Sequence, residues 1–405
     1  MNIIYLAQLS PEIRFPPFDG PANHIRHIIA EWLKMGHHVR FIGGIDSAYW
    51  TTEDLQNFKK INQKKKSIYE SAIRKIQSMT GAPYVNYFAS KRFAESIRIN
   101  SSNFHCLYER VSWMGYGGLL AAKKLRIPLI LEFNGDPLHD LKSKGQVPNG
   151  VQLSTSIWIF RKILNSASLI IASGKGWKNN LTERWGVPSH KVRVVENGTP
   201  LIDLLKRHEL SNFQETSSST PINIAYLGGF FPWHGTISAV KSFSRLMEQE
   251  QNVHLFMIGA GSELEKTKAL TRELGIERNV TFTGSLTPEE YAPILASCEI
   301  GLSPYCGWNE YSGLKLFDYK AAGLAVIASG ENGQPDTLTH MQTGMIIPPC
   351  DEQALTDALI YLISNHACRK QMGQQARLEA ETRHSWRHTA QNILYAIEET
   401  TGLRS

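Results

Sequence analysis

Two acidic residues and a lysine lie within the nine-residue segment Glu310-Tyr-Ser-Gly-Leu-Lys-Leu-Phe-Asp318. Ser312 and Gly313 precede an amphipathic run, so the pattern predicts a helix that Ser312 caps. The N–H groups of its first turn and the positive end of its dipole would attract a diphosphate, and Lys315 adds a cation there. Carboxylates at Glu310 and Asp318 can accept hydrogen bonds from sugar and ribose hydroxyls. The segment therefore predicts a site for a sugar diphosphate, against the simpler interpretation of a solvated helix face.

Glycine-rich loops follow two apolar runs in the same half of the chain. The loop Gly228-Gly-Phe-Phe-Pro-Trp-His-Gly235 carries three glycines, which let a backbone approach a phosphate without a Cβ in the way. A tight turn is the alternative interpretation, because glycines after a strand are common in α/β proteins. In Gly259-Ala-Gly261 the dinucleotide fingerprint fails, since Leu264 stands where a third small residue belongs. The sequence also lacks the lysine motif of a phosphate loop, which disfavours a dehydrogenase or an ATPase.

Short apolar runs alternate with helix-length amphipathic stretches in both halves of the chain, which predicts two mostly parallel sheets covered by helices. The strands predicted in the first half are Ile3–Ala7, Val39–Ile42, Phe104–Tyr108, Leu129–Phe133, Leu169–Ser173 and Val192–Glu196. Those predicted in the second half are Ile222–Leu227, Val253–Ile258, Val280–Phe282, Ile300–Ser303 and Ala325–Ala328. The predicted fold class is α/β, with two Rossmann-like domains expected to face each other across a cleft.

The length of 405 residues favours two domains, and a polar segment marks the boundary between them. Residues 210–221 are too poor in apolar side chains to pack and are predicted to be the linker. The N-terminal domain is expected to comprise residues 1–209 and the last helix, 386–405, which folds back onto it. The C-terminal domain is expected to comprise residues 222–385.

Composition narrows the class of protein. Apolar residues at 42% and charged residues at 20% fit a folded globular chain. Five scattered cysteines without a CxxC pair argue against a disulfide framework or a zinc site, and favour a reducing compartment. The absence of a long apolar run or a signal-like N terminus predicts a cytoplasmic protein.

One stretch has a strong charge bias within a chain whose formal net charge is only +6. Residues 59–98 hold ten Lys or Arg against Glu70 and Glu95. A solvated helix face is the simple interpretation, and contact with anionic lipid headgroups or a phosphorylated acceptor is the functional one. Nucleic acid is disfavoured, because no recognisable nucleic-acid motif accompanies the basic residues.

The segment around Glu310 resembles the marker of glycosyltransferase family 4, a family of retaining enzymes with the two-domain GT-B fold. That marker is Glu, seven residues, Glu, and a run ending Ala-Gly-x-Pro-Val-Ile-Ala, and here Glu310, Asp318 and Ala321–Ala328 match it with conservative changes. The resemblance runs nearly end to end. Further matching segments are Asp19–His24, Gly36–Val39, Tyr108–Arg110, Arg126–Pro128, Glu196–Gly198, Gly228–Gly235, Gly259–Gly261, Phe282–Gly284 and Gly344–Pro348.

The resemblance implies transfer of a sugar, hexosyl-type (EC 2.4), from a nucleoside diphosphate sugar to an acceptor hydroxyl, with retention and without a metal or other cofactor. It implies a polysaccharide, glycolipid or glycoconjugate acceptor, a cytoplasmic location and work at the inner face of the membrane. The catalytic residues it implies are Glu310, Asn134 and Lys315. The implied donor-binding residues are Gly20, Gly229, His234, Gly284, Ser285, Leu286, Ser312, Gly313, Leu314 and Asp318, and the acceptor-side residues are His24, Glu132 and Asp136.

Three positions depart from the pattern of many relatives. Gly229 and His234 stand where those relatives have an Arg and a Lys for the phosphates, and Asn134 stands where they have a histidine. His234 is expected to supply part of the missing charge, and Lys315 with the helix dipole the rest. Glu132 could equally be a buried structural acid. A nucleotide-sugar-binding protein of weak or no activity and a sugar-nucleotide epimerase therefore remain alternatives.

Overall fold

The computed structural model describes residues 1–8, 21–45, 48–61, 68–80, 86–143, 145–209, 221–307, 313–331 and 335–403. The chain forms two compact units. Unit 1 is Met1–Glu196 with Thr389–Ser405, and unit 2 is Asn197–His388.

Unit 1 contains an eight-stranded sheet in the order β4-β3-β2-β1-β5-β6-β7-β8. Its pairings are parallel except those of β3 with β2 and with β4. The strands are β1 (Asn2–Gln8), β2 (His38–Ile45), β3 (Ala48–Thr52), β4 (Lys59–Ile61), β5 (Cys106–Arg110), β6 (Leu129–Phe133), β7 (Leu169–Ala172) and β8 (Val192–Val194). The helices are α1 (Pro21–Lys34), α2 (Ile68–Thr80), α3 (Tyr87–Ile99), α4 (Gly117–Leu125), α5 (Pro137–Ser143), α6 (Gly150–Ser166), α7 (Lys175–Asn179) and α15 (Trp386–Thr401).

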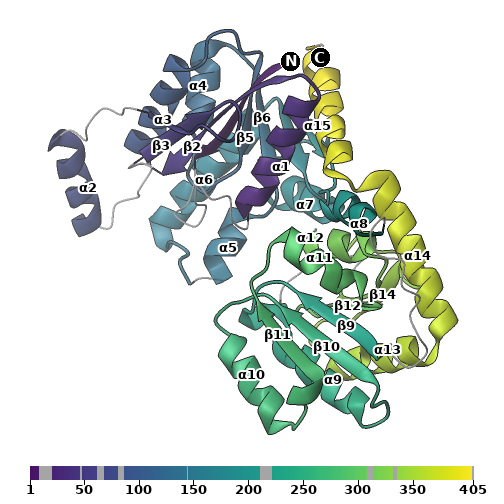
Figure 1. Cartoon of the computed structure of the whole chain (residues 1–405). Helices are drawn as coiled ribbons and strands as arrows, with labels where there is room; N and C mark the ends of the chain where they lie inside the picture. Colours follow the sequence, from purple (N-terminus) through teal and green to yellow (C-terminus); the bar gives the residue numbers. More distant parts are fainter. Residues whose placement is uncertain are drawn as a thin grey trace. The chain divides into compact units, whose positions relative to one another are not determined.

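Unit 2 contains a six-stranded parallel sheet in the order β11-β10-β9-β12-β13-β14. Its strands are β9 (Ile222–Leu227), β10 (Val253–Ile258), β11 (Val280–Gly284), β12 (Ile300–Ser303), β13 (Ala325–Ser329) and β14 (Gly344–Ile347). Its helices are α8 (Leu201–Glu209), α9 (Thr236–Met247), α10 (Leu264–Glu273), α11 (Pro288–Ala296), α12 (Leu314–Ala321), α13 (Glu352–Ser364) and α14 (His366–Arg383). In Figure 1 the sheet of unit 2 lies between α9 and α13 on one side and α11 and α12 on the other.

Successive side chains of a strand point to opposite faces of the sheet, and in unit 2 both faces are buried. In β9 the side chains of Ile224 and Tyr226 lie in one hydrophobic cluster, whereas Ala225 lies in the other. The alternation follows from the two-residue period of a strand. The predicted strands are confirmed, but β3, β4 and β14 are absent from the prediction. Lys59–Ile61 is too polar to show an apolar run, and its pairing comes from tertiary contact.

The units divide at Glu196 and Thr389 rather than at the predicted 209 and 386. The assignment of residues 197–209 to the first domain is therefore wrong. Leu201, Leu204 and Leu205 on α8 belong to a core cluster with Ala225 and Leu316 of unit 2. The predicted linker, residues 210–221, lies outside the described residues except for Pro221.

The expectation that the cysteines do not pair is also wrong. Cys306 and Cys350 form a disulfide across 44 residues of sequence. Cys306 follows β12 and Cys350 follows β14, so parallel strands bring both to the same edge of the sheet. Spacing in the sequence does not show this, because the contact depends on the strand order.

Candidate functional site

The strand order places two groups of loops where open α/β sheets bind ligands. In unit 2, β9 lies between β10 and β12, so the chain leaves β9 and β12 on opposite sides of the sheet. A crevice opens at the carboxyl ends of strands at such a switch point. The loops that follow β9 and β12 contain the glycine-rich segment and the segment before Glu310. In unit 1 the corresponding strands are β1 and β5.

The glycine-rich loop after β9 packs closely against two neighbouring loops. A Cβ at Gly235, which has φ 68°, would lie 1.6 Å from the Pro304 carbonyl oxygen. A Cβ at Gly259 would lie 1.9 Å from the Gly228 carbonyl oxygen. Backbone hydrogen bonds fix these contacts, from Gly228 N–H to Ile258 O at 2.9 Å and from Cys306 N–H to Trp233 O at 2.9 Å. The glycines are therefore required by backbone packing, whether or not a phosphate binds.

Lys315 lies over this loop, in the first turn of α12. Its Nζ is 5.0 Å from the ring centre of Tyr226 and 4.8 Å from that of Tyr305. A Cβ on Gly228 would lie 2.9 Å from the same Nζ. The side chain is only 7% exposed, so the ammonium lies among aromatic faces that favour a cation. We call Tyr226, Gly228, Gly229, His234, Tyr305 and Lys315 the Lys315 cluster.

The surroundings of His234 favour its neutral form. Burial and the neighbouring Lys315 ammonium lower the pKa of His234 to about 4, against the raising effect of a hydrogen bond to Gly229. The imidazole is therefore neutral near pH 7. Its Nδ1 lies 2.6 Å from the Gly229 carbonyl oxygen, so Nδ1 carries the proton. Lys315 is therefore the cation of this cluster near pH 7, and the predicted role of His234 at the phosphates stays a prediction.

The start of α12 differs from the prediction in one respect. Its N-cap residue is Gly313, and none of the described side chains caps it. Leu314 and Lys315 are the first two residues of the helix. Glu310 and Ser312 lie outside the described residues, so their predicted roles stay predictions.

Asp318 is occupied by partners within unit 2. Its carboxylate accepts hydrogen bonds from Thr199 Oγ1 at 2.6 Å and Tyr291 OH at 3.0 Å. Burial raises the pKa of Asp318 to about 6, and these two hydrogen bonds limit the rise. Thr199 Oγ1 also accepts from the Leu201 N–H, so Asp318 fixes the start of α8. Ribose binding by Asp318 stays a prediction beside this structural role.

The residues predicted to border the base lie after β11. Gly284 has φ 75°, and a Cβ there would meet open space. Its carbonyl oxygen accepts from the Gly259 N–H at 2.8 Å, which joins this loop to the one after β10. Ser285 is exposed, whereas Leu286 is half-buried against the core.

In unit 1, a buried carboxylate organises the end of β6. Glu132 Oε1 lies 3.1 Å from His24 Nε2 and 3.2 Å from Arg110 Nη1, and Tyr5 OH donates to Oε2 at 2.6 Å. Burial would raise the pKa of Glu132, but His24, Arg110 and Tyr5 outweigh it and lower the pKa to about 2. We call Tyr5, His24, Arg110, Glu132 and Asn134 the Glu132 cluster.

The three residues predicted on one strand face separate in the structure. The Asn134 side-chain amide donates to Glu132 Oε1. Asp136 instead accepts from the Leu138 N–H at 2.9 Å and the Trp185 indole N–H at 3.1 Å, so it caps α5. The chain leaves β6 after Phe133, which ends the strand alternation. The acceptor-side roles of Glu132 and Asp136 and the catalytic role of Asn134 stay predictions, and Gly20 lies outside the described residues.

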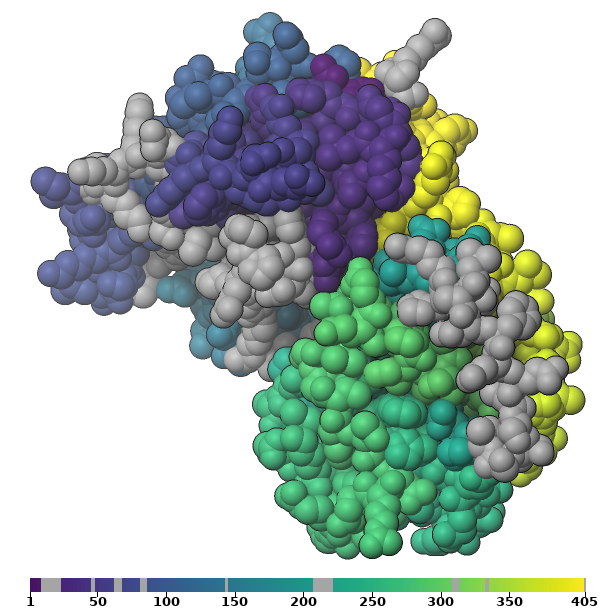
Figure 2. Space-filling view, in the orientation of Figure 1, coloured from purple at the N-terminus to yellow at the C-terminus, as the bar shows by residue number. Residues whose placement is uncertain are grey.

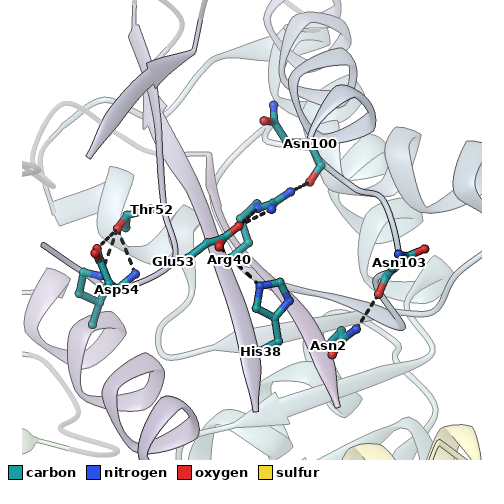
Figure 3. Close-up of polar contacts among 9 residues, drawn as sticks. Asn2, His38, Arg40, Thr52, Glu53, Asp54, Asn100 and Asn103 are labelled. Carbon is teal, nitrogen blue, oxygen red and sulfur yellow. Dashed lines mark hydrogen bonds and ion pairs between the residues drawn. The ribbon is translucent and has the colours of Figure 1, made fainter. Parts of the chain in front are cut away.

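Another polar group lies at the opposite ends of the unit 1 strands. Figure 3 shows Arg40 near the start of β2, between Glu53 and the Asn100 carbonyl. It borders a cavity of about 520 Å³ that Thr52, Glu53 and Asp54 also line. Arg40 pairs with Glu53, and Asp54 accepts backbone bonds from Gln56 and Asn57. Because these charges bind one another, we do not place the functional site here.

Two family models match the chain in succession. The model described as Glycosyltransferase Family 4 matches residues 18–201, and the one described as Glycosyl transferases group 1 matches residues 208–379. The chain belongs to glycosyltransferase family 4. Unit 1 of this family 4 glycosyltransferase thus corresponds to the first model, and unit 2 to the second.

Solved structures show the GT-B fold for this family 4 chain. Sucrose-phosphate synthase from Thermosynechococcus elongatus aligns with a TM-score of 0.71 at 17% identity, covering 99% of this chain and 100% of its own. HepE from Anabaena, solved with UDP and glucose, aligns with a TM-score of 0.67 at 15% identity, covering 98% and 100%.

Curated relatives are glycosyltransferases by name. The D-inositol 3-phosphate glycosyltransferase of Corynebacterium glutamicum is 27% identical over 58% of this chain and 57% of its own length. The phosphatidyl-myo-inositol mannosyltransferase of Mycobacterium leprae is 25% identical over 54% of this chain and 57% of its own. The chain thus spans a little over half the length of these relatives.

Several members of both clusters of this family 4 glycosyltransferase are not predicted from the sequence. Arg110 ends the apolar run of β5 with a charge, a signal that could have marked it. Tyr226 carried no such signal, because tyrosine fits the apolar pattern of β9. Tyr305 reaches Lys315 through the fold of the loop after β12, which local spacing does not encode.

Proposed function

We propose that the protein transfers a sugar from a nucleoside diphosphate sugar to an acceptor hydroxyl, with retention of anomeric configuration. The observation that carries the proposal is Lys315, placed over Gly228 at the switch point of unit 2. A cation there, beside the N terminus of α12, suits the negative charge that develops on a leaving diphosphate. The membership of family 4 supports the reaction class.

The donor roles follow the same geometry. Lys315 and the N–H groups of residues 312–315 would hold the diphosphate, which makes a metal unnecessary for charge neutralisation. The loop containing Gly229 and His234 would border the phosphates, and Glu310 would contact the transferred sugar. Asp318 would bind the ribose and Gly284 to Leu286 would border the base. HepE was solved with UDP and glucose, which supports a nucleotide sugar as the donor.

The acceptor is proposed to lie against unit 1. Glu132 holds the His24 imidazole at 3.1 Å, so the ring has a fixed orientation toward its remaining surroundings. Asp136 completes the proposed acceptor side, whereas Asn134, which donates to the same Glu132 carboxylate, would lie at the reacting centre and Gly20 would border the donor. Two relatives are named for inositol phosphate or phosphatidylinositol, which supports a polar or lipid-linked acceptor. The proposed location is the cytoplasm, at the inner membrane face.

A donor panel tests the proposal. The full chain is incubated with UDP-, GDP-, ADP- and dTDP-sugars, with inositol phosphate and with lipid extract as acceptors, and products are identified by mass spectrometry. We expect release of one nucleoside diphosphate with a matching glycosylated product. Anomeric NMR of that product tests retention.

The same panel separates the alternatives. An epimerase would convert the sugar nucleotide without forming a glycosylated acceptor. A binding protein would bind one donor without consuming it. Either result with every acceptor offered would overturn the transferase proposal.

A further inference from the structure

The apolar side of α2 is uncovered. Ile68, Tyr69, Ile76 and Met79 are exposed to 91%, 71%, 58% and 76%. At ~100° per residue these positions fall on one side of the helix. Figure 2 shows α2 as a dark blue projection at one edge of unit 1. A soluble surface helix normally turns such a side toward the core.

α2 is instead attached to unit 1 through a charged side. Glu70 is only 2% exposed. Its carboxylate lies 2.9 Å from Arg92 Nη2 on α3 and 3.0 Å from Arg74 Nε on α2 itself. The Glu70–Arg92 ion pair therefore orients the helix so that its apolar side faces away from α3.

The exposed charges of the stretch 59–98 that contains α2 are mostly positive. Lys59, Lys60, Lys75 and Lys91 are exposed, and Lys75 neighbours Met79 one turn along the helix. The acids of the described stretch, Glu70 and Glu95, are both engaged by arginines. Lys75 thus adds a positive charge beside the exposed apolar side, and the stretch that contains α2 is basic.

We propose that α2 lies in the interfacial layer of an anionic phospholipid membrane. Ile68, Ile76 and Met79 would enter the acyl boundary, while Lys59, Lys60 and Lys75 face the headgroup phosphates. A second copy of this chain would bring like charges together, which disfavours a homodimer on this face. The contact is peripheral, since none of the described helices is long and apolar enough to cross a bilayer. The purpose of this contact rests on the proposed function, because α2 would bring the enzyme to an acceptor carried by the membrane.

Vesicle flotation of the full chain tests the apolar contribution. We compare wild type with Ile76→Ser/Met79→Ser and with the matched control Leu378→Ser/Tyr395→Ser, whose native side chains are 55% and 67% exposed on α14 and α15. On phosphatidylcholine vesicles containing phosphatidylglycerol, the α2 variant is expected to bind about 10-fold more weakly or worse, and the control as wild type. Equal losses in both variants would overturn the proposal.

The lysines are tested in the same assay. Lys59→Gln, Lys60→Gln and Lys75→Gln are each expected to weaken binding about fivefold, and added salt should reduce the difference from wild type. Wild type should bind vesicles of phosphatidylcholine alone much more weakly. Equal binding to both vesicles would overturn the choice of an anionic surface.

Hydrogen exchange locates the contact without reference to turnover. Amides of residues 68–80 should exchange more slowly on anionic vesicles, in the absence of any donor. Unchanged exchange there, or a wild-type dimer that Ile76→Ser/Met79→Ser converts to a monomer, would overturn the proposal. Donor consumption with a water-soluble acceptor is measured separately, so a failed transferase proposal would leave the vesicle result standing.

Discussion

The Glu132 cluster and the Lys315 cluster manage a buried charge in opposite ways. Glu132 is held by His24, Arg110 and the Tyr5 hydroxyl, so its charge is matched by ionic and hydrogen-bonding partners inside unit 1. Lys315 lies between the faces of Tyr226 and Tyr305, and its neighbour His234 is neutral. The contacts of Glu132 serve rigidity, whereas the aromatic faces beside Lys315 favour a cation at that position.

Removing Glu132 should give the largest effect. Glu132→Ala leaves His24 and Arg110 without their buried counter-charge, so we expect unit 1 to lose about 3–5 kcal/mol of unfolding free energy. Chemical denaturation measures the loss. Glu95→Ala on α3 is the control, because its pair with Arg98 is on the surface and should contribute about 0–1 kcal/mol. Similar losses in both variants would mean that the Glu132 cluster does not rigidify unit 1.

Breaking the disulfide beside the Lys315 cluster should have the next largest effect. Cys350→Ser, or a dithiol reductant, opens the link to Cys306 and should lower the unfolding free energy of unit 2 by about 2–4 kcal/mol. Thermal unfolding with and without reductant checks this. Cys368→Ser, a change at an unpaired cysteine, should leave the reductant effect intact. A wild type indifferent to reductant would contradict the pairing.

Removing the Lys315 charge should weaken donor binding rather than stability. Lys315→Met keeps an apolar side chain between the two tyrosines, and donor affinity should fall about 10- to 100-fold. Calorimetric titration with the sugar nucleotide that supports turnover measures the loss. Lys241→Met, at a lysine of α9 paired with Glu352, is the control and should bind as wild type. Retained affinity in Lys315→Met would remove the observation that carries the proposed function.

The smallest effect is expected at His234. Because the pKa of His234 is lowered in the folded protein, the unfolding free energy of unit 2 is highest above the ordinary histidine pKa. It declines as the pH falls from there toward about 4. Donor affinity should therefore vary less than about threefold between roughly pH 6 and 8. His234→Gln should keep the same flat profile. A wild-type affinity that falls as the pH rises through about 6.5, and is flattened by the substitution, would show a cationic His234 after all.

Sequence patterns predicted the features that depend on residues close together in the chain. The alternating strands, the helix after Gly313 and the glycine loop all depend on neighbouring residues, and the structure contains them. The neutrality of His234 and the pairing of Cys306 with Cys350 depend on burial and strand order. The same holds for Asp318, whose partner Thr199 is 119 residues away in the chain. Such long-range contacts have no signature in residue spacing.

Because α15 packs on unit 1, the two units cannot be completed in the order in which they are translated. The Trp32 indole donates to the Ala390 carbonyl at 3.1 Å, and Thr389 donates to the Glu196 carbonyl at 2.9 Å. Because the ribosome releases Thr389 and the residues after it later than unit 2, unit 1 lacks α15 while unit 2 emerges. The unit whose strands are translated first therefore receives its last helix only after the other unit has been synthesised.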